Sequence, residues 1–96
     1  MSFNIKIETD FSPQEVVEVI HSALEHEKHV ARYKIKRYSI ICEDFEAKYG
    51  FSSSELRVKL EEGILLDDSD FLDWYAAKKG LDHWTKRLEI LSGISM

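Results

Sequence analysis

The chain has 96 residues, of which 44% are hydrophobic and 32% are charged, a balance that is typical of one globular domain and excludes a disordered chain. Its formal net charge of −5 excludes the broad positive field on which most nucleic-acid-binding domains depend. The single cysteine, Cys42, excludes an internal disulfide and fits a reducing compartment. No apolar run resembles a signal peptide or spans a bilayer, so we expect a cytoplasmic protein that is not held in a membrane.

The first predicted element is a short strand near the N-terminus. Phe3, Ile5 and Ile7 alternate with polar residues as far as Thr9, which is the period of a half-buried strand. No second strand pattern follows, and a lone strand leaves its backbone groups unpaired. We therefore expect residues 1–11 to form either a strand that pairs with another chain or an extended arm.

One long amphipathic helix is predicted for residues 12–50. Ser12 and Pro13 form a strong start signal, and Gly50 is the next clear stop. At about 100° per residue, the apolar side chains between them fall within a sector of roughly 80°. These side chains are Val17, Ile20, Leu24, Ala31, Ile35, Tyr38, Cys42, Phe45 and Tyr49. The stripe keeps its direction through the charged residues 25–29, so we expect no break in the helix.

Two shorter helices are predicted at residues 53–62 and 69–92. Ser52 and Asp68 are placed to cap them, with Glu55 as a reciprocal capping partner of Ser52. In the second of these helices the apolar residues follow heptad steps: Trp74, Ala77, Leu81, Trp84, Leu88 and Leu91. We therefore predict a mainly α fold in a single domain of residues 1–96. Its arm or strand (1–11) precedes the long helix (12–50) and a two-helix region (51–92), and the helices form a small three-helix core.

No pattern in the sequence predicts an enzyme, a metal site or a cofactor. Glu18 and His21 form a Glu-x-x-His motif of the kind found in four-helix di-metal sites, but such a site needs a second copy of the motif. Cys42 lies inside the apolar stripe, and the serines at 52–54 are explained by capping. The basic residues between 28 and 37 share the helix surface with acids, so they do not predict nucleic-acid binding by the protein alone.

The stretch from residue 65 to residue 84 holds five aspartates and four aromatic rings. Carboxylates at a helix start are stabilised by the unpaired N–H groups there, which explains Asp67 and Asp68. Asp73 lies past the first turn, and a Trp beside exposed acids is typical of an interface for a basic partner. Two interpretations stay open. Either Asp70, Asp73 and Trp74 form a partner-binding surface, or the acids cap the helix and Trp74 belongs to the core, as its heptad position allows.

Part of the long helix extends beyond its own predicted core. At about 1.5 Å per residue, Leu24 is roughly 30 Å from Phe45, and the core is expected between about residues 31 and 91. An apolar stripe at that distance needs another surface to cover it. We therefore expect Val17, Ile20 and Leu24 to contact a second copy of the chain, in a homodimer, or a partner protein.

Residues 48–84, KYGFSSSELRVKLEEGILLDDSDFLDWYAAKKGLDHW, combine a Lys-Tyr-Gly turn, a Ser-led short helix, a Gly-containing acidic link and an acidic helix with Trp. This pattern, somewhat over a third of the chain, resembles small prokaryotic antitoxins of two-gene toxin–antitoxin modules. The link after Gly63 is more apolar than the short Gly-Asp-Asp link typical of that pattern. The resemblance implies a non-enzymatic protein that binds and neutralises a small toxin through extended or helical arms.

Two alternatives to the antitoxin interpretation remain. One is a ribbon–helix–helix repressor, in which residues 3–9 of two copies pair in the major groove and the long helix turns near His26. The other is a homodimeric structural or adaptor protein.

Overall fold

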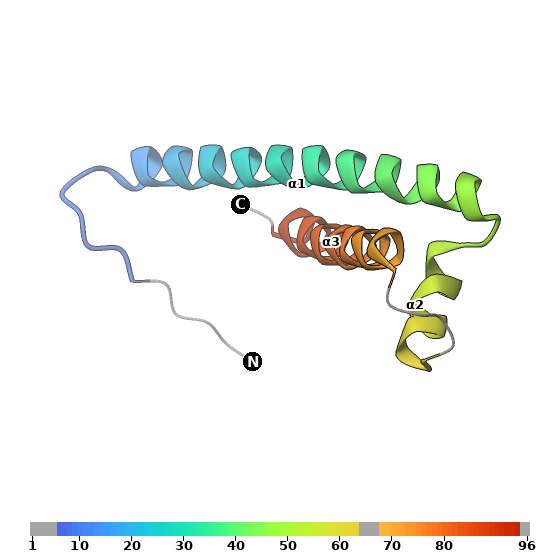
Figure 1. The fold of residues 1–96 in the computed structure, drawn as a ribbon. Helices are drawn as coiled ribbons and strands as arrows, with labels where there is room; N and C mark the ends of the chain where they lie inside the picture. Colours follow the sequence, from blue (N-terminus) through green and yellow to red (C-terminus); the bar gives the residue numbers. More distant parts are fainter. Residues whose placement is uncertain (1–5, 64–67, 95–96) are drawn as a thin grey trace.

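The structure, a computed structural model, describes residues 6–63 and 68–94. Within these residues it contains three helices, α1 (Pro13–Tyr49), α2 (Ser53–Glu61) and α3 (Ser69–Ser92), as Figure 1 shows. The predicted mainly α architecture is confirmed. The strand predicted for residues 3–9 is not supported, because residues 6–9 have no strand geometry and no neighbouring strand pairs with them, and residues 3–5 lie outside the described residues.

The long helix α1 begins and ends at the signals read from the sequence. The Ser12 hydroxyl accepts the Glu15 N–H at 3.2 Å, and the Glu15 carboxylate accepts the Ser12 N–H at 3.1 Å, a complete capping box. At the other end Gly50 adopts φ 77°, a left-handed conformation that favours glycine, and its N–H bonds to the Glu46 carbonyl. The helix is unbroken between these caps, as predicted.

The two shorter helices also begin at their predicted caps. Ser52 accepts the Glu55 N–H at 3.1 Å to start α2, and Asp68 accepts the Asp70 N–H at 2.8 Å to start α3. The reciprocal contact from the Glu55 carboxylate, which the sequence also predicted, is not among the hydrogen bonds at this cap. Each polar N-cap satisfies an N–H group that would otherwise have no partner inside the helix.

Helix α3 packs antiparallel along the C-terminal half of α1. Near the start of α3, the ring of Phe71 lies 5.0 Å from that of Tyr49. In its middle, Gly80 lies so close to the Tyr38 ring that a Cβ atom there would be only 2.8 Å from it. Near its end, Arg87 donates to the Glu27 carboxylate at 3.0 Å. The contact positions therefore move toward the N-terminus of α1 as they move toward the C-terminus of α3, which is the order of an antiparallel pair.

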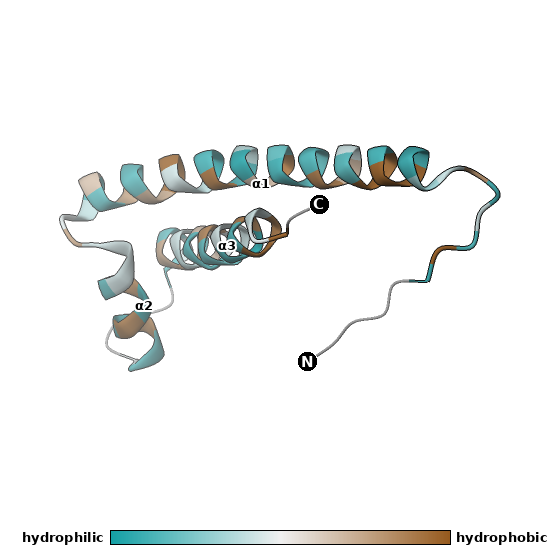
Figure 2. Cartoon of the chain, turned by 180° about the vertical axis from the view of Figure 1, so that it is seen from behind, coloured by the Kyte–Doolittle hydropathy of each residue, from teal (hydrophilic) through white to brown (hydrophobic). Residues whose placement is uncertain are grey.

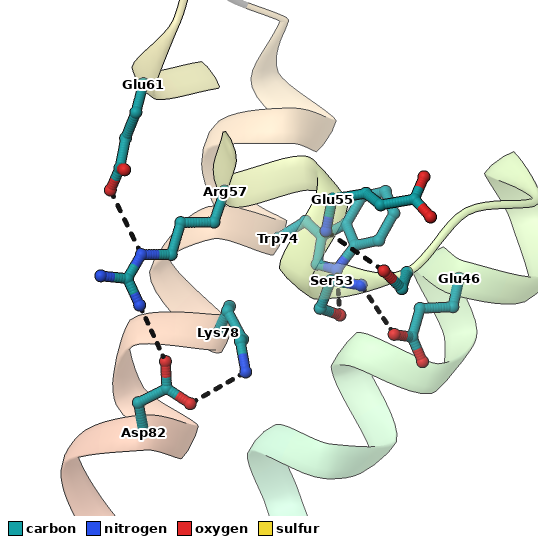
Figure 3. Close-up of polar contacts among 9 residues, drawn as sticks. Glu46, Ser53, Glu55, Arg57, Glu61, Trp74, Lys78 and Asp82 are labelled. Carbon is teal, nitrogen blue, oxygen red and sulfur yellow. Dashed lines mark hydrogen bonds and ion pairs between the residues drawn. The ribbon is translucent and has the colours of Figure 1, made fainter. Parts of the chain in front are cut away.

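The centre of the core is Trp74, whose side chain is 0% exposed. Its ring packs against those of Phe45, Tyr49 and Phe51, with centroid separations of 5.6, 5.9 and 5.0 Å. Its indole N–H donates to the Ser53 hydroxyl at 2.7 Å (Figure 3). The interpretation of Trp74 as a partner-binding residue is therefore wrong for this fold, because aromatic packing and a buried hydrogen bond occupy the whole side chain.

The molecule is elongated, with principal extents of 58 × 27 × 19 Å and a radius of gyration of 19.0 Å. A compact chain of this length would have a radius of gyration of about 12–13 Å. Most of the difference comes from α1, whose N-terminal half extends past the end of α3, and from the segment that precedes it (Figure 1).

Candidate interaction surface

The feature that stands out is the part of α1 that extends beyond α3. The ion pair between Glu27 and Arg87 joins the two helices, and α3 ends at Ser92, little more than one turn past this pair. We call residues 13–24 of α1, which lie on the N-terminal side of this ion pair, the projecting segment. At about 1.5 Å per residue it is roughly 18 Å long.

The projecting segment continues the apolar stripe that forms the core farther along the same helix. We call its part of this stripe, Val17, Ile20 and Leu24, the seam. By helical position the seam lies in one sector with Ala31, Cys42 and Tyr49, which α2 and α3 cover. Figure 2 shows the hydrophobic residues of this half on the side of α1 where α3 lies farther along. Ala31 is 0% exposed whereas Val17 is 46% exposed.

A second apolar feature lies beside the seam, where the chain enters α1. Residues from the extended segment and from the first turns of α1 line an open groove of about 1040 Å³: Thr9, Phe11, Glu15, Val16, Glu18, Val19, Ile20, Ser22, Ala23 and His26. Phe11 and Val19 are two of the most exposed large hydrophobic side chains in the described chain. The groove is therefore apolar at its centre and carries two glutamates at its edge.

Charge is segregated along α1. Residues 6–30 carry six acidic and two basic residues, a net charge of −4 with histidine neutral. The acidic residues are Glu8, Asp10, Glu15, Glu18, Glu25 and Glu27, and the basic ones are Lys6 and Lys28. The next turns carry only basic charges, Arg32, Lys34, Lys36 and Arg37. The projecting segment therefore lies in an acidic stretch, and a basic stretch follows directly.

The six predicted partner-binding residues do not form one surface. Val17, Ile20 and Leu24 lie together on the seam, whereas Asp70 contacts Lys48, at the far end of α1 and about 36 Å from Leu24 along the helix axis. Trp74 is buried at that end, and Asp73 is exposed in the first turns of α3. A partner at the seam therefore does not need the aspartates of α3.

Asp70 already has partners within the chain. Its carboxylate accepts Lys48 Nζ at 2.7 Å and Tyr49 Oη at 2.6 Å. The hydrogen bond from Lys48, followed by that from Tyr49, lowers the pKa of Asp70. The same carboxylate raises the pKa of Lys48 and that of Tyr49, through the hydrogen bond in each case. Sequence reasoning missed these contacts because the partners lie 21 and 22 residues away in the chain.

Cys42 and Ser53, two nucleophilic side chains of the described residues, both lie in the core. Burial raises the pKa of the Cys42 thiol, which is 3% exposed, and the Ser53 hydroxyl is engaged by Trp74. Across residues 6–63 and 68–94, no three His, Cys, Asp or Glu side chains gather in a way that could hold a metal ion. No helix in the described part of the chain has both the length and the apolar character needed to cross a membrane.

No protein-family model, curated protein or solved structure matches the chain. The geometry and charge of α1 are therefore the basis for the functional interpretation.

Proposed function

We propose that this chain is a non-enzymatic protein-binding module of the antitoxin type, which holds a small basic toxin against the seam of the projecting segment. The observation that carries the proposal is the continuation of the core stripe beyond the core, where Val17 is 46% exposed and Ile20 and Leu24 are only partly buried. Complete burial of such a side chain stabilises a complex by about 1.5–3 kcal/mol, and those half-exposed here would contribute a part of this.

Charge supports a basic partner. The stretch of chain that carries the seam is acidic, with a net charge of −4 over residues 6–30. Complementary charges at the rim of an interface mainly accelerate association and suppress wrong partners, while buried apolar groups slow dissociation. The seam would therefore supply the affinity, and the acids around it would select a basic protein.

The resemblance of residues 48–84 to antitoxins supports a toxin as that partner. In this structure the described residues of that range, 48–63 and 68–84, build the packed end of the molecule, where Trp74 and Leu56 are fully buried. The ribbon–helix–helix alternative lacks its central requirement, because α1 has no turn near His26. An adaptor protein without a toxin remains the second candidate, and it would use the same seam.

The test compares two valines of similar exposure. Val17 in the seam is 46% exposed and Val58 on α2 is 50% exposed, so aspartate at either position disturbs the fold to a similar degree. Each variant is co-expressed with the product of a neighbouring toxin-like reading frame, and growth rescue and the affinity of the purified pair are measured. We expect Val17→Asp to lose rescue and to weaken binding at least about tenfold, which corresponds to ~1.4 kcal/mol.

The control variant Val58→Asp should neutralise the toxin as the unchanged protein does. Equal rescue by Val17→Asp and the unchanged protein would contradict a role for the seam. An unchanged protein that binds no such gene product would favour the adaptor function.

A further inference from the structure

We propose that two copies of this chain pair through their α1 helices in antiparallel orientation, about a twofold axis at His26. The contact uses a face of α1 about 150° around the helix from the seam, so the proposal does not depend on the toxin-binding function. The residues that carry it are Glu15, Val19, His26, Tyr33 and Arg37, which we call the flank.

The flank is one continuous face of α1. Its residues are separated by four, seven, seven and four positions, which keeps them within about 40° of one another around the helix. The face is exposed along its whole length: Val19 is 69% exposed and Tyr33 57%, and Glu15 and Arg37 are exposed as well. Tyr33 accepts a hydrogen bond from Arg37 at 3.3 Å, which holds the two side chains on the same side.

The flank is complementary to itself when it is reversed. Glu15 and Arg37 each lie eleven residues from His26, and Val19 and Tyr33 each lie seven residues from it. An antiparallel pair centred on His26 therefore sets Glu15 beside Arg37 of the second copy and Val19 against Tyr33 of the second copy. A twofold axis produces each contact twice. A parallel pair would instead place glutamate beside glutamate and arginine beside arginine.

The segregation of charge along α1 favours a second copy as the occupant. Of the acidic residues, Glu15 and Glu18 of one chain would lie level with the basic stretch from Arg32 to Arg37 of the other. Opposite charges in this arrangement stabilise the pair and fix its direction. The contact from residue 15 to residue 37 would be about 34 Å long, roughly three heptads of a coiled coil.

In this register the ring of Tyr33 from the second copy would enter the groove beside Phe11. Val19 and Ala23 line the groove, and Tyr33 of the second copy would lie over them. The small side chains of Ser22 and Ala23, which also line it, permit close approach of a second helix. Because of the twofold axis, Tyr33 of each copy would be buried against the apolar side chains in the groove of the other copy.

The first test is a charge exchange, read by sedimentation equilibrium on the full chain. The unchanged protein should sediment at twice its 11.2 kDa mass. Arg37→Glu and Glu15→Arg should each raise the dimer dissociation constant about tenfold, because two attractive pairs become repulsive. The double variant should recover most of the affinity. Arg32→Glu, the same charge change on a different face of the helix, is the matched control and should dissociate less readily than Arg37→Glu.

Glu15 also caps α1, so its replacement frays the first turn. Fraying would not be reversed by Arg37→Glu, and recovery in the double variant therefore separates pairing from loss of the cap. A double variant as weak as the single ones would overturn the proposal. A monomeric unchanged protein would also overturn it, and if that monomer still binds the toxin, the proposed function stands alone.

The second test establishes direction. Nitroxide labels on His26→Cys, in a Cys42→Ala background, should lie close together in the dimer because position 26 is on the axis. Labels on Asp44→Cys, eighteen residues away, should be about 54 Å apart. Short distances at both positions would show a parallel pair, and a long distance at position 26 would show a different interface; either result would refute the register.

Discussion

The two ends of α1 have the same apolar stripe in two different environments. Toward Tyr49 the stripe lies under α2 and α3 and contains Ala31 and Cys42, both buried, whereas toward Pro13 it contains Val17, which is about half exposed. The cause is length. α1 has 37 residues and α3 has 24, so at about 1.5 Å per residue α3 is roughly 20 Å too short to cover its neighbour. An amphipathic pattern therefore shows that a face is suited to burial and leaves open what buries it.

The largest difference between the two ends should appear on truncation of Trp74. Trp74→Ala removes the ring that Phe45, Tyr49 and Phe51 surround, and we expect it to lower the free energy of unfolding by about 3–5 kcal/mol. Val17→Ala in the projecting segment should cost less than about 1 kcal/mol, since Val17 is 46% exposed. Urea denaturation followed by circular dichroism measures both. Equal losses would mean that the two ends are equally packed.

The close approach of α1 and α3 at Gly80 gives the next largest effect. Alanine there would place a Cβ 2.8 Å from the Tyr38 ring, and such overpacking costs about 1–3 kcal/mol. The better helix propensity of alanine returns about 1 kcal/mol, so we expect a net loss of about 1–2 kcal/mol for Gly80→Ala. In a Tyr38→Ala background the same change should stabilise the protein. A double-mutant cycle of unfolding free energies would show this reversal of sign.

The buried hydrogen bond between α2 and α3 should contribute a similar amount. Ser53→Ala leaves the Trp74 indole N–H without its acceptor, an unsatisfied buried donor that costs about 1–3 kcal/mol. The neighbouring Ser54 is exposed, so Ser54→Ala should change stability by no more than about 0.5 kcal/mol. Thermal melts of the two variants make the comparison. If both behave alike, the hydrogen bond contributes nothing measurable.

The smallest effect should come from Asp70, and it should depend on pH. The pKa of Asp70 is lowered from 3.8 by Lys48 and Tyr49, so its contribution to stability is present above about pH 4 and is lost as pH falls through the folded value. The pKa values of Lys48 and Tyr49 are raised, so their contribution is lost as pH rises above about 10. The unchanged protein should exceed Asp70→Asn in stability between these limits, and the difference should shrink at both extremes.

Urea midpoints taken across this pH range give the measurement. Asp73→Asn is the matched control, because Asp73 lies one turn away in an exposed position of α3. A difference between Asp70→Asn and the unchanged protein that is constant with pH would assign Asp70 a role in packing or capping alone.

The helices were predictable because their ends are set by local chemistry. Ser12, Pro13 and Gly50 fix α1, and Ser52 and Asp68 fix the starts of the other two, through contacts within a few residues. The environment of Trp74 was not predictable, since a Trp beside aspartates fits both an interface and a core. What decides it is the approach of Phe45, Tyr49 and Phe51 from other elements. The engagement of Asp70 by Lys48 likewise depends on how α3 packs on α1.

Because Cys42 is buried, the rate at which its thiol is alkylated reports how often the packed helices separate. A thiol that is 3% exposed, with its pKa raised by burial, is alkylated only when α1 separates from the helices that cover it. The same unbroken helix α1 carries both the projecting segment and Cys42. The labelling rate of this thiol can be compared with and without a partner on the projecting segment. A slower or faster rate would show that binding there makes opening of the helices around Cys42 rarer or more frequent.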